Sequence, residues 1–195
     1  MSTARRGERH RQTKETHVDL VLVVDGSGAA TASTGIPFFD HMLEQLGKHG
    51  GFDLSVDAEG DLAVDLHHTV EDVGIAFGEA LRDALGDKAG VRRFASALVP
   101  LDEALVQVAL DLSGRPFLVY DVDPISEWIG TFDPQLCEEF WRAVAFAAGI
   151  TLHLRSVSGR NGHHIIEASF KAVARSLRDA VRVEGTGIPS TKGTL

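Results

Sequence analysis

Two histidines stand side by side at two places in this chain, and each pair is followed by a glutamate one helical turn later. The two segments read DLHHTVED and GHHIIEASF. His163 follows His67 by 96 residues. Glu167 follows Glu71 by the same interval. A matched group of histidines and acids at a constant interval indicates a duplicated half-domain, so the fold must give both copies equivalent positions.

Hydrophobic periodicity supports this division into halves. Alternating apolar residues predict strands, and apolar residues spaced three or four apart predict helices. In the first half, strands are expected at residues 17–24, 29–33 and 52–58, with helices at 35–51 and 67–85. The second half repeats the order, with two strands within 104–122, a helix at 133–149, a strand at 150–157 and a helix at 163–181. Each half therefore reads strand, strand, helix, strand, helix, which predicts an α+β fold whose strands pair into one sheet with helices on one face.

The length of the chain places both halves in one domain, and its net charge bears on the kind of partner. The chain of 195 residues fits a single domain over residues 14–195, made of half-repeats at about 14–90 and 91–185. Residues 1–13 are rich in arginine and are expected to form a flexible basic arm in solvent. The net charge of −9 argues against a nucleic-acid-binding surface.

Composition favours a soluble protein of the cytoplasm. The chain has one cysteine, so no disulfide can form within it, and a reducing compartment is expected. It has no run of about 18 apolar residues and no apolar signal segment at its N-terminus. No association with a membrane is therefore expected.

The paired histidines have the chemistry of metal ligands. A helix turns by about 100° per residue, so two adjacent histidines cannot easily bind the same ion. His67 shares a helix face with Glu71 four residues on, and His68 shares one with the same glutamate three residues on. Each pair is therefore expected to point at two places, and the two pairs can supply two metal sites. Imidazole and carboxylate ligands suit Mn, Fe, Ni, Co or Zn, and ligand type alone does not distinguish among these ions.

A longer pattern of segments runs along nearly the whole chain. Its members, in order, are KET (14–16), GIPFFDHMLEQL (35–46), DLHHTVED (65–72), PLDEAL (100–105), DLSGRP (111–116), TLHLR (151–155), HHIIEASFKAVARSL (163–177) and PSTKG (189–193). A chain with these motifs in this order resembles the imidazoleglycerol-phosphate dehydratases of histidine biosynthesis. The resemblance implies a ribosomal protein S5 domain 2-like fold and two Mn(II) ions per active site.

By the resemblance, each metal ion takes one histidine from each pair. One ion would be bound by His67, His153, His163 and Glu167. The other would be bound by His41, His68, His164 and Glu71. Four protein ligands leave two positions of an octahedral shell open for substrate.

The resemblance also implies roles in proton transfer and substrate binding. The expected catalytic residues are Glu15, His49, Glu71 and Glu167. The expected substrate contacts are Glu15, Gln45, His49, Arg93, Arg115, Lys171, Ser190, Thr191 and Lys192. The last three of these lie in a C-terminal tail that would contact the substrate. Loss of one contact to the substrate phosphate is expected to weaken binding roughly ten- to a hundredfold.

The implied reaction converts imidazoleglycerol phosphate to imidazole-acetol phosphate and water. Metal binding at both ring nitrogens would favour the imidazolate, which expels the side-chain hydroxyl to give a diazafulvene intermediate, and proton loss then gives the enol. The family assembles through trimers into a 24-subunit cubic homo-oligomer with active sites between subunits. The expected partner is thus a phosphorylated imidazole, with neither nucleic acid nor membrane.

Two other functions would use some of the same residues. A dinuclear metallohydrolase would use the metal ligands, but it would not explain the KET, SGRP and PSTKG segments. A non-catalytic protein would use the ions only to join subunits in a metal-linked assembly. The product distinguishes the three, since a dehydratase forms a ketone, a hydrolase releases phosphate and an assembly protein forms neither.

Overall fold

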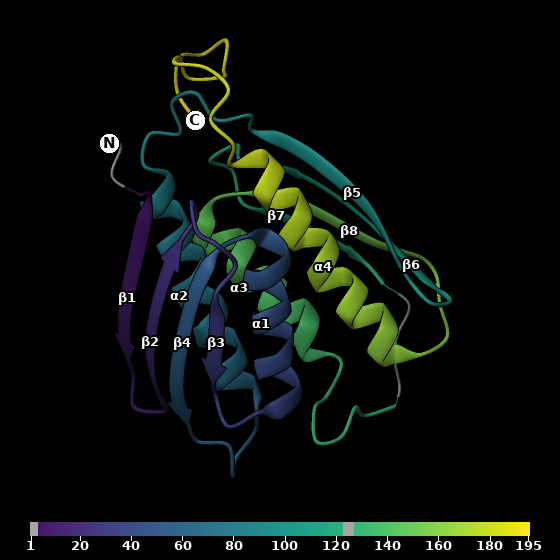
Figure 1. The fold of residues 1–195 in the computed structure, drawn as a ribbon. Coiled ribbons are helices and arrows are strands. Elements are labelled where there is room, and N and C mark those ends of the chain that lie inside the picture. The colour runs from purple at the N-terminus through teal and green to yellow at the C-terminus, as the bar shows by residue number, and fades with distance from the viewer. Residues whose placement is uncertain (1–3, 123–126) are drawn as a thin grey trace.

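A computed structural model describes residues 4–122 and 127–195, and within them the chain forms eight strands and four helices (Figure 1). The strands are β1 Arg6–Gln12, β2 Thr16–Val23, β3 Ala30–Ser33, β4 Asp53–Gly60, β5 Phe94–Leu101, β6 Ala104–Asp111, β7 Phe117–Asp121 and β8 Thr151–Ser158. The helices are α1 Pro37–Gly50, α2 His67–Leu85, α3 Leu136–Ala148 and α4 Gly162–Ala180. In this part of the chain, no helix is long and apolar enough to cross a membrane.

The two halves of the chain form sheets of the same topology. The strand order is β1-β2-β4-β3 in the first sheet and β5-β6-β8-β7 in the second. In each sheet the first three strands of this order are antiparallel, and the last strand is parallel to its neighbour. The predicted α+β fold with a duplicated half-domain is thus confirmed, and each half forms its own sheet rather than adding strands to a shared one.

The helices lie between the sheets and keep them apart (Figure 1). α1 and α2 cover the inner face of the first sheet, and α3 and α4 cover the inner face of the second. The two helical layers pack on each other, α2 against α3 and α1 against α4. Because the helices occupy both inner faces, no helix of residues 4–122 and 127–195 covers the outer face of either sheet.

An aromatic cluster fills the contact between the helical layers. Phe39 of α1, Phe140 of α3 and Phe170 of α4 are all buried. The ring centroid of Phe140 lies 5.3 Å from that of Phe39 and 5.4 Å from that of Phe170. Each such pair adds about 0.5–1.5 kcal/mol to stability beyond the burial of its area. The cluster therefore holds α1 against α4, the two helices that carry several of the predicted ligands.

Two glycines let α2 and α3 approach closely. A Cβ on Gly74 would lie 2.9 Å from the carbonyl oxygen of Phe140. A Cβ on Gly78 would lie 2.7 Å from the carbonyl oxygen of Val144. The spacing of four residues puts both glycines on the same face of α2. A side chain at either position would push the two helical layers apart.

The N-terminal segment differs from the sequence expectation. Residues 6–12, expected within a flexible basic arm, form β1, which pairs antiparallel with β2 along its whole length. Arg9 bonds Glu79 of α2 at 3.1 Å. Arg11 bonds Asp72 of the same helix at 2.8 Å. These ion pairs and the apolar stems of the arginines attach β1 to α2, while residues 1–3 lie outside the described residues.

Candidate metal and substrate site

The two histidine pairs stand at the start of the two longest helices. His67 and His68 open α2, and His163 and His164 follow Gly162 at the start of α4. Within each pair the imidazole rings are nearly perpendicular, at 83° and 82°, with centroids 6.4 and 6.1 Å apart. The two rings of a pair therefore face different directions, because one residue turns the helix by about 100°.

The first histidine of each pair faces the glutamate of its own helix. His163 Nε2 lies 3.0 Å from Glu167 Oε2. His67 Nε2 lies 3.7 Å from Glu71 Oε2. The spacing of four residues, rather than three, thus brings histidine and acid together.

His41 on α1 joins the group at the start of α4. Its Nε2 lies 3.8 Å from Glu167 Oε2. The ligand atoms of His41, His163 and Glu167 all lie within 4.8 Å of one another, which holds for no other histidine, cysteine or acid group of this size in the described residues. Two imidazole nitrogens and a carboxylate oxygen are a suitable donor set for Mn, Fe, Co or Zn.

Glu167 is the acid at the centre of this group. Its carboxylate also accepts a hydrogen bond from Lys171 Nζ at 2.7 Å. Burial favours the neutral acid, but the hydrogen bonds from Lys171 and His163 outweigh it, so the pKa of Glu167 lies below its usual value. The carboxylate is therefore charged at neutral pH and can act as an anionic ligand.

Within one chain, this grouping differs from the two ligand sets that the resemblance implies, and those sets stay a prediction. His41 was expected in the same ligand set as Glu71, yet it lies with His163 and Glu167. Glu71 was expected in a different set from His67, yet it lies beside it. The packing of α1 against α4 brings His41 to Glu167, and the helical spacing of four residues brings Glu71 to His67.

The second histidine of each pair faces an acid from a neighbouring segment. His68 Nδ1 lies 3.1 Å from both carboxylate oxygens of Asp61, in the loop after β4. His164 Nδ1 lies 2.8 Å from Oε2 of Glu103, in the turn between β5 and β6. The hydrogen bonds to these carboxylates raise the pKa of both histidines. The hydrogen bond from His164 lowers the pKa of Glu103 most, and hydrogen bonds from the backbone N–H groups of Asn161 and Arg160 lower it further, to about 2.

Two predicted residues lie away from the group at His41 in the single chain. His153 is on the outer face of the second sheet, where it lines a cavity of about 390 Å³ with Asp121 and Arg155. Glu15 is in the turn between β1 and β2, with its Oε2 3.8 Å from His68 Nδ1. One chain therefore brings neither residue to the group at His41.

Gln45 and His49 extend the predicted site along α1. His49 Nε2 donates to the amide oxygen of Gln45 at 3.0 Å, which leaves Nδ1 free. Burial, and next the positive charges of Lys171 and Arg175 on α4, lower the pKa of His49. The imidazole is therefore neutral near pH 7 and can take up a proton.

The remaining predicted contacts gather at the C-terminal tail. One cavity of about 550 Å³ is lined by Arg93, Arg115, Pro189, Ser190, Thr191 and Lys192. The guanidinium of Arg93 bonds the Asp111 carboxylate at 2.7 and 3.1 Å and donates to the carbonyl of Pro189 at 2.7 Å. A cavity lined by three cationic side chains is suited to an anion such as phosphate.

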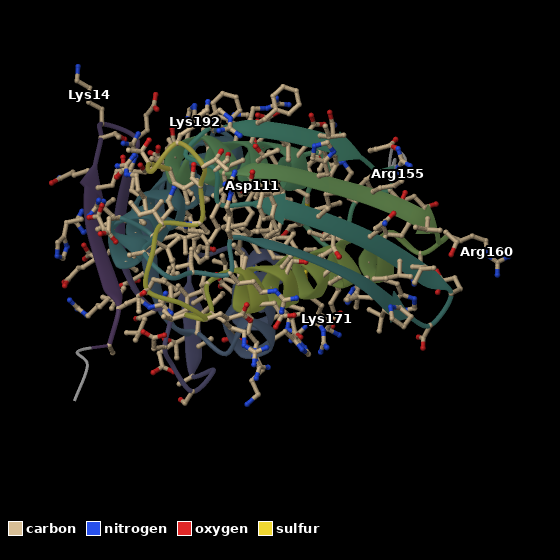
Figure 2. All side chains as sticks on the ribbon, turned by 90° about the horizontal axis from the view of Figure 1, so that it is seen from above. Lys14, Asp111, Arg155, Arg160, Lys171 and Lys192 are labelled. Carbon is tan, nitrogen blue, oxygen red and sulfur yellow. The ribbon has the colours of Figure 1, made fainter. Side chains whose placement is uncertain are left out.

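The tail cavity and the ligand group at His41 lie toward opposite ends of α4. The backbone N–H of Arg93 donates to the carbonyl of Ala180, the last residue of α4, at 3.0 Å. Glu167 stands thirteen residues earlier on the same helix. At 1.5 Å per residue, about 20 Å of helix separates them. Figure 2 likewise shows Lys171 of α4 well away from Lys192 of the tail.

Three acids that the sequence reasoning missed hold predicted residues in place. Asp61 and Glu103 face the second histidines of the two pairs, and Asp111 holds the guanidinium of Arg93. Glu103 and Asp111 stand in the segments PLDEAL and DLSGRP, so the sequence did contain a signal for these two. Asp61 stands in no such segment, and only the folded chain shows its contact.

Relatives named imidazoleglycerol-phosphate dehydratase match the chain over almost its whole length. The family model described as imidazoleglycerol-phosphate dehydratase matches residues 34–177. The chain is 59% identical over 194 residues to the imidazoleglycerol-phosphate dehydratase of Parafrankia sp. (strain EAN1pec), which covers 98% of this chain and 100% of the relative. It is 60% identical over 186 residues to the enzyme of the same name from Acidothermus cellulolyticus, and the match covers 95% of this chain and 90% of that relative.

Solved structures share the fold. The crystal structure of imidazoleglycerol-phosphate dehydratase from Staphylococcus aureus subsp. aureus N315 matches with a TM-score of 0.81 at 36% identity, covering 90% of this chain and 97% of that one. The enzyme from Pyrococcus furiosus in complex with (S)-C348 matches with a TM-score of 0.82 at 37% identity, covering 96% and 100%. The chain therefore belongs to the imidazoleglycerol-phosphate dehydratase family, the hydro-lyases that remove water from imidazoleglycerol phosphate in histidine biosynthesis.

Proposed function

We propose that this dehydratase works with two Mn(II) ions per active site. The observation that carries the proposal is the group of His41, His163 and Glu167, whose ligand atoms lie within 4.8 Å of one another. Its two imidazoles and one ionised carboxylate fit a divalent ion of this kind. His67 and Glu71, 3.7 Å apart, are the start of a second group with the same types of donor. The first group has three protein ligands and the second has two, so neither fills the coordination shell of a metal ion.

Histidines of neighbouring copies would complete both groups. The remaining predicted ligands are His68, His153 and His164. Within the described part of one chain, none of the three joins the group at His41. His68 and His164 turn Nδ1 to acids of their own chain, and His153 lies on an uncovered sheet face. We therefore propose that these three histidines serve metal ions across contacts between copies.

The length of the substrate is a second reason to expect a shared site. An imidazole ring, a three-carbon chain and a phosphate together span less than about 10 Å. About 20 Å of helix separates Glu167 from the tail cavity. One substrate molecule touches both only if the tail cavity of one copy faces the start of α4 in another. This supports a homo-oligomer, for which we propose the 24-subunit cubic particle built from trimers.

The side chains of the protein would bind the substrate and move its protons. Two bound divalent ions would stabilise the negative charge that the imidazole ring carries when it loses its proton. Arg115 and Lys192 would hold the phosphate in the tail cavity. His49, neutral and held by Gln45, keeps Nδ1 free to take a proton from the carbon chain. Glu15 would donate a proton to the leaving hydroxyl, which then departs as water.

We also propose that the protein works in the cytoplasm. Cys137, the one cysteine of the chain, is fully buried in α3. Burial raises its pKa well above the usual value of a thiol, so it is unreactive. A chain whose one thiol is buried and unpaired is suited to a reducing compartment.

Metal depletion followed by a product assay tests the proposed function. Protein stripped of metal by a chelator is expected to form no imidazole-acetol phosphate, and Mn(II) should raise the rate by roughly a hundredfold or more. Metal analysis of the reloaded protein should find about two Mn(II) per chain. Release of inorganic phosphate in place of the ketone would indicate a metallohydrolase. Full turnover by the metal-free protein would contradict the proposal.

A further inference from the structure

The acids that face the second histidines decide which ring nitrogen carries the proton. An ionised carboxylate can only accept a hydrogen bond. Glu103 lies 2.8 Å from Nδ1 of His164, so this nitrogen must donate. Asp61 Oδ1 lies 3.1 Å from Nδ1 of His68, so that nitrogen must donate as well. A neutral imidazole with its proton on Nδ1 has a free lone pair on Nε2, which is the form that binds a metal through that atom.

Glu103 is held in one orientation. Its Oε2 faces His164, while its Oε1 accepts from the backbone N–H of Arg160 at 3.1 Å and of Asn161 at 2.8 Å. Each oxygen therefore has donors of its own. The carboxylate joins the turn between β5 and β6 to the loop before α4, and its two oxygens occupy different positions, one facing two fixed backbone donors and the other facing the imidazole.

Asp61 is held less strictly. Both of its oxygens lie 3.1 Å from His68 Nδ1. Within residues 4–122 and 127–195, no other hydrogen bond reaches these two oxygens. The two ends of this carboxylate are therefore equivalent, and it can rotate without losing a partner.

We propose that Glu103 and Asp61 are positioning residues that keep His164 and His68 in the Nδ1-protonated tautomer, so that each ring offers Nε2 to a metal ion. The proposal rests on the metal-dependent function proposed above. Because Glu103 is locked and Asp61 is not, changing acid to amide is expected to have different consequences at the two positions.

Glu103→Gln should invert the tautomer of His164. The amide oxygen must face the two backbone donors, because the NH₂ group in that place would set donor against donor. The NH₂ group then faces Nδ1 of His164, which has to accept, so the ring proton moves to Nε2 and blocks metal binding. The affinity for Mn(II) at the site served by His164 is expected to fall roughly 10–100-fold.

Two further variants separate this effect from simple loss of a contact. Asp61→Asn can rotate its amide oxygen toward Nδ1 of His68, so its loss of affinity should stay below about threefold. Glu103→Ala lets water contact Nδ1 of His164 and imposes no tautomer, so its loss should be smaller than that of Glu103→Gln. The isosteric variant is thus expected to be the worse metal binder of the two.

Mn(II) titration of the metal-depleted proteins, followed by the electron paramagnetic resonance of the free ion, measures these affinities independently of activity. Urea unfolding reports whether each variant folds. Wild-type affinity in Glu103→Gln would overturn the proposal, and so would weaker binding by Glu103→Ala than by Glu103→Gln, because Glu103 would then only anchor its turn. If Glu103→Gln does not fold, a tenfold or greater loss in Asp61→Asn overturns it instead. Absence of Mn(II) binding by the wild type would overturn the metal-dependent function as well.

Discussion

Glu167→Gln is expected to lower kcat by roughly two to three orders of magnitude while the chain still folds. The change keeps the shape of the side chain that bonds His163 at 3.0 Å and Lys171 at 2.7 Å, but removes its charge. A neutral amide is a weak ligand for a divalent cation, and it leaves the charge of Lys171 without its counter-ion. Metal analysis should find the bound Mn(II) reduced to about one per chain.

Glu138→Gln is the matched control for this variant. Glu138 lies on the exposed face of α3 and pairs with Arg142 four residues on, as Glu167 pairs with Lys171. Loss of an exposed pair of this kind changes stability by less than about 1 kcal/mol. Its kcat and metal content should match those of the wild type. Wild-type turnover in Glu167→Gln would show that Glu167 is not a metal ligand.

Arg115→Met is expected to raise KM roughly ten- to a hundredfold and to leave kcat at saturation nearly unchanged. It removes one charged contact from the tail cavity, and such a contact contributes about 1.5–3 kcal/mol to binding. The fold should not suffer, because the side chain is 67% exposed and its nearest acid, Asp111, is 4.0 Å away. Steady-state kinetics over a wide range of substrate concentration measure both constants.

Arg142→Met provides the comparison for the loss of a surface arginine. Arg142 lies on α3 and does not line the tail cavity. Its removal should change neither constant. Inorganic phosphate should inhibit this control as it inhibits the wild type, and should inhibit Arg115→Met more weakly. An unchanged KM in Arg115→Met would show that the tail cavity does not hold the substrate phosphate.

The strands show how far the fold can be predicted from the sequence. β4 alternates apolar and polar residues, and β2 carries a buried residue at every second position, so local periodicity is sufficient to find them. β1 reads RGERHRQ and has no such alternation, because its inner face is occupied by arginines that pair with acids of α2. β5 turns Phe94 and Leu98 outward and Ala95 and Ala97 inward, which obscures the usual pattern. Both missed strands pair with the next strand along the chain, but their inner faces pack on helices that are distant in sequence, β1 on α2 and β5 on α4.

The candidate metal ligands also divide into those that local spacing can place and those that it cannot. Helical spacing indicates that adjacent histidines face different directions, and the perpendicular rings of both pairs have this geometry. It cannot decide where His41 belongs, because that depends on how α1 packs against α4. The packing is set by buried aromatic residues of three helices, among them Phe39 and Phe140. A candidate ligand that tertiary packing brings to the group can therefore be placed only in the folded chain.

The tail cavity was accessible to motif comparison but not to local reasoning. Arg93, Arg115 and Lys192 are far apart in the sequence, and each taken alone is typical of an exposed loop or tail. The fold brings them together because Arg93 bonds both Asp111 of β6 and the carbonyl of Pro189. Figure 2 shows Asp111 among the strands of the second sheet and Lys192 on the tail.

Mixing two defective variants, assayed at a substrate concentration far below the raised KM of the tail variant, tests most directly whether each active site is shared between copies. Glu167→Gln damages the ligand group on α4, and Arg115→Met combined with Lys192→Met damages the tail cavity. If one copy supplies the ligand group and another the tail cavity, about a quarter of the sites in an equal, co-assembled mixture receive both intact parts. We expect about a quarter of the wild-type activity to return. If both parts belonged to the same chain, every site would carry a lesion, and a mixture as inactive as its two components would contradict the account.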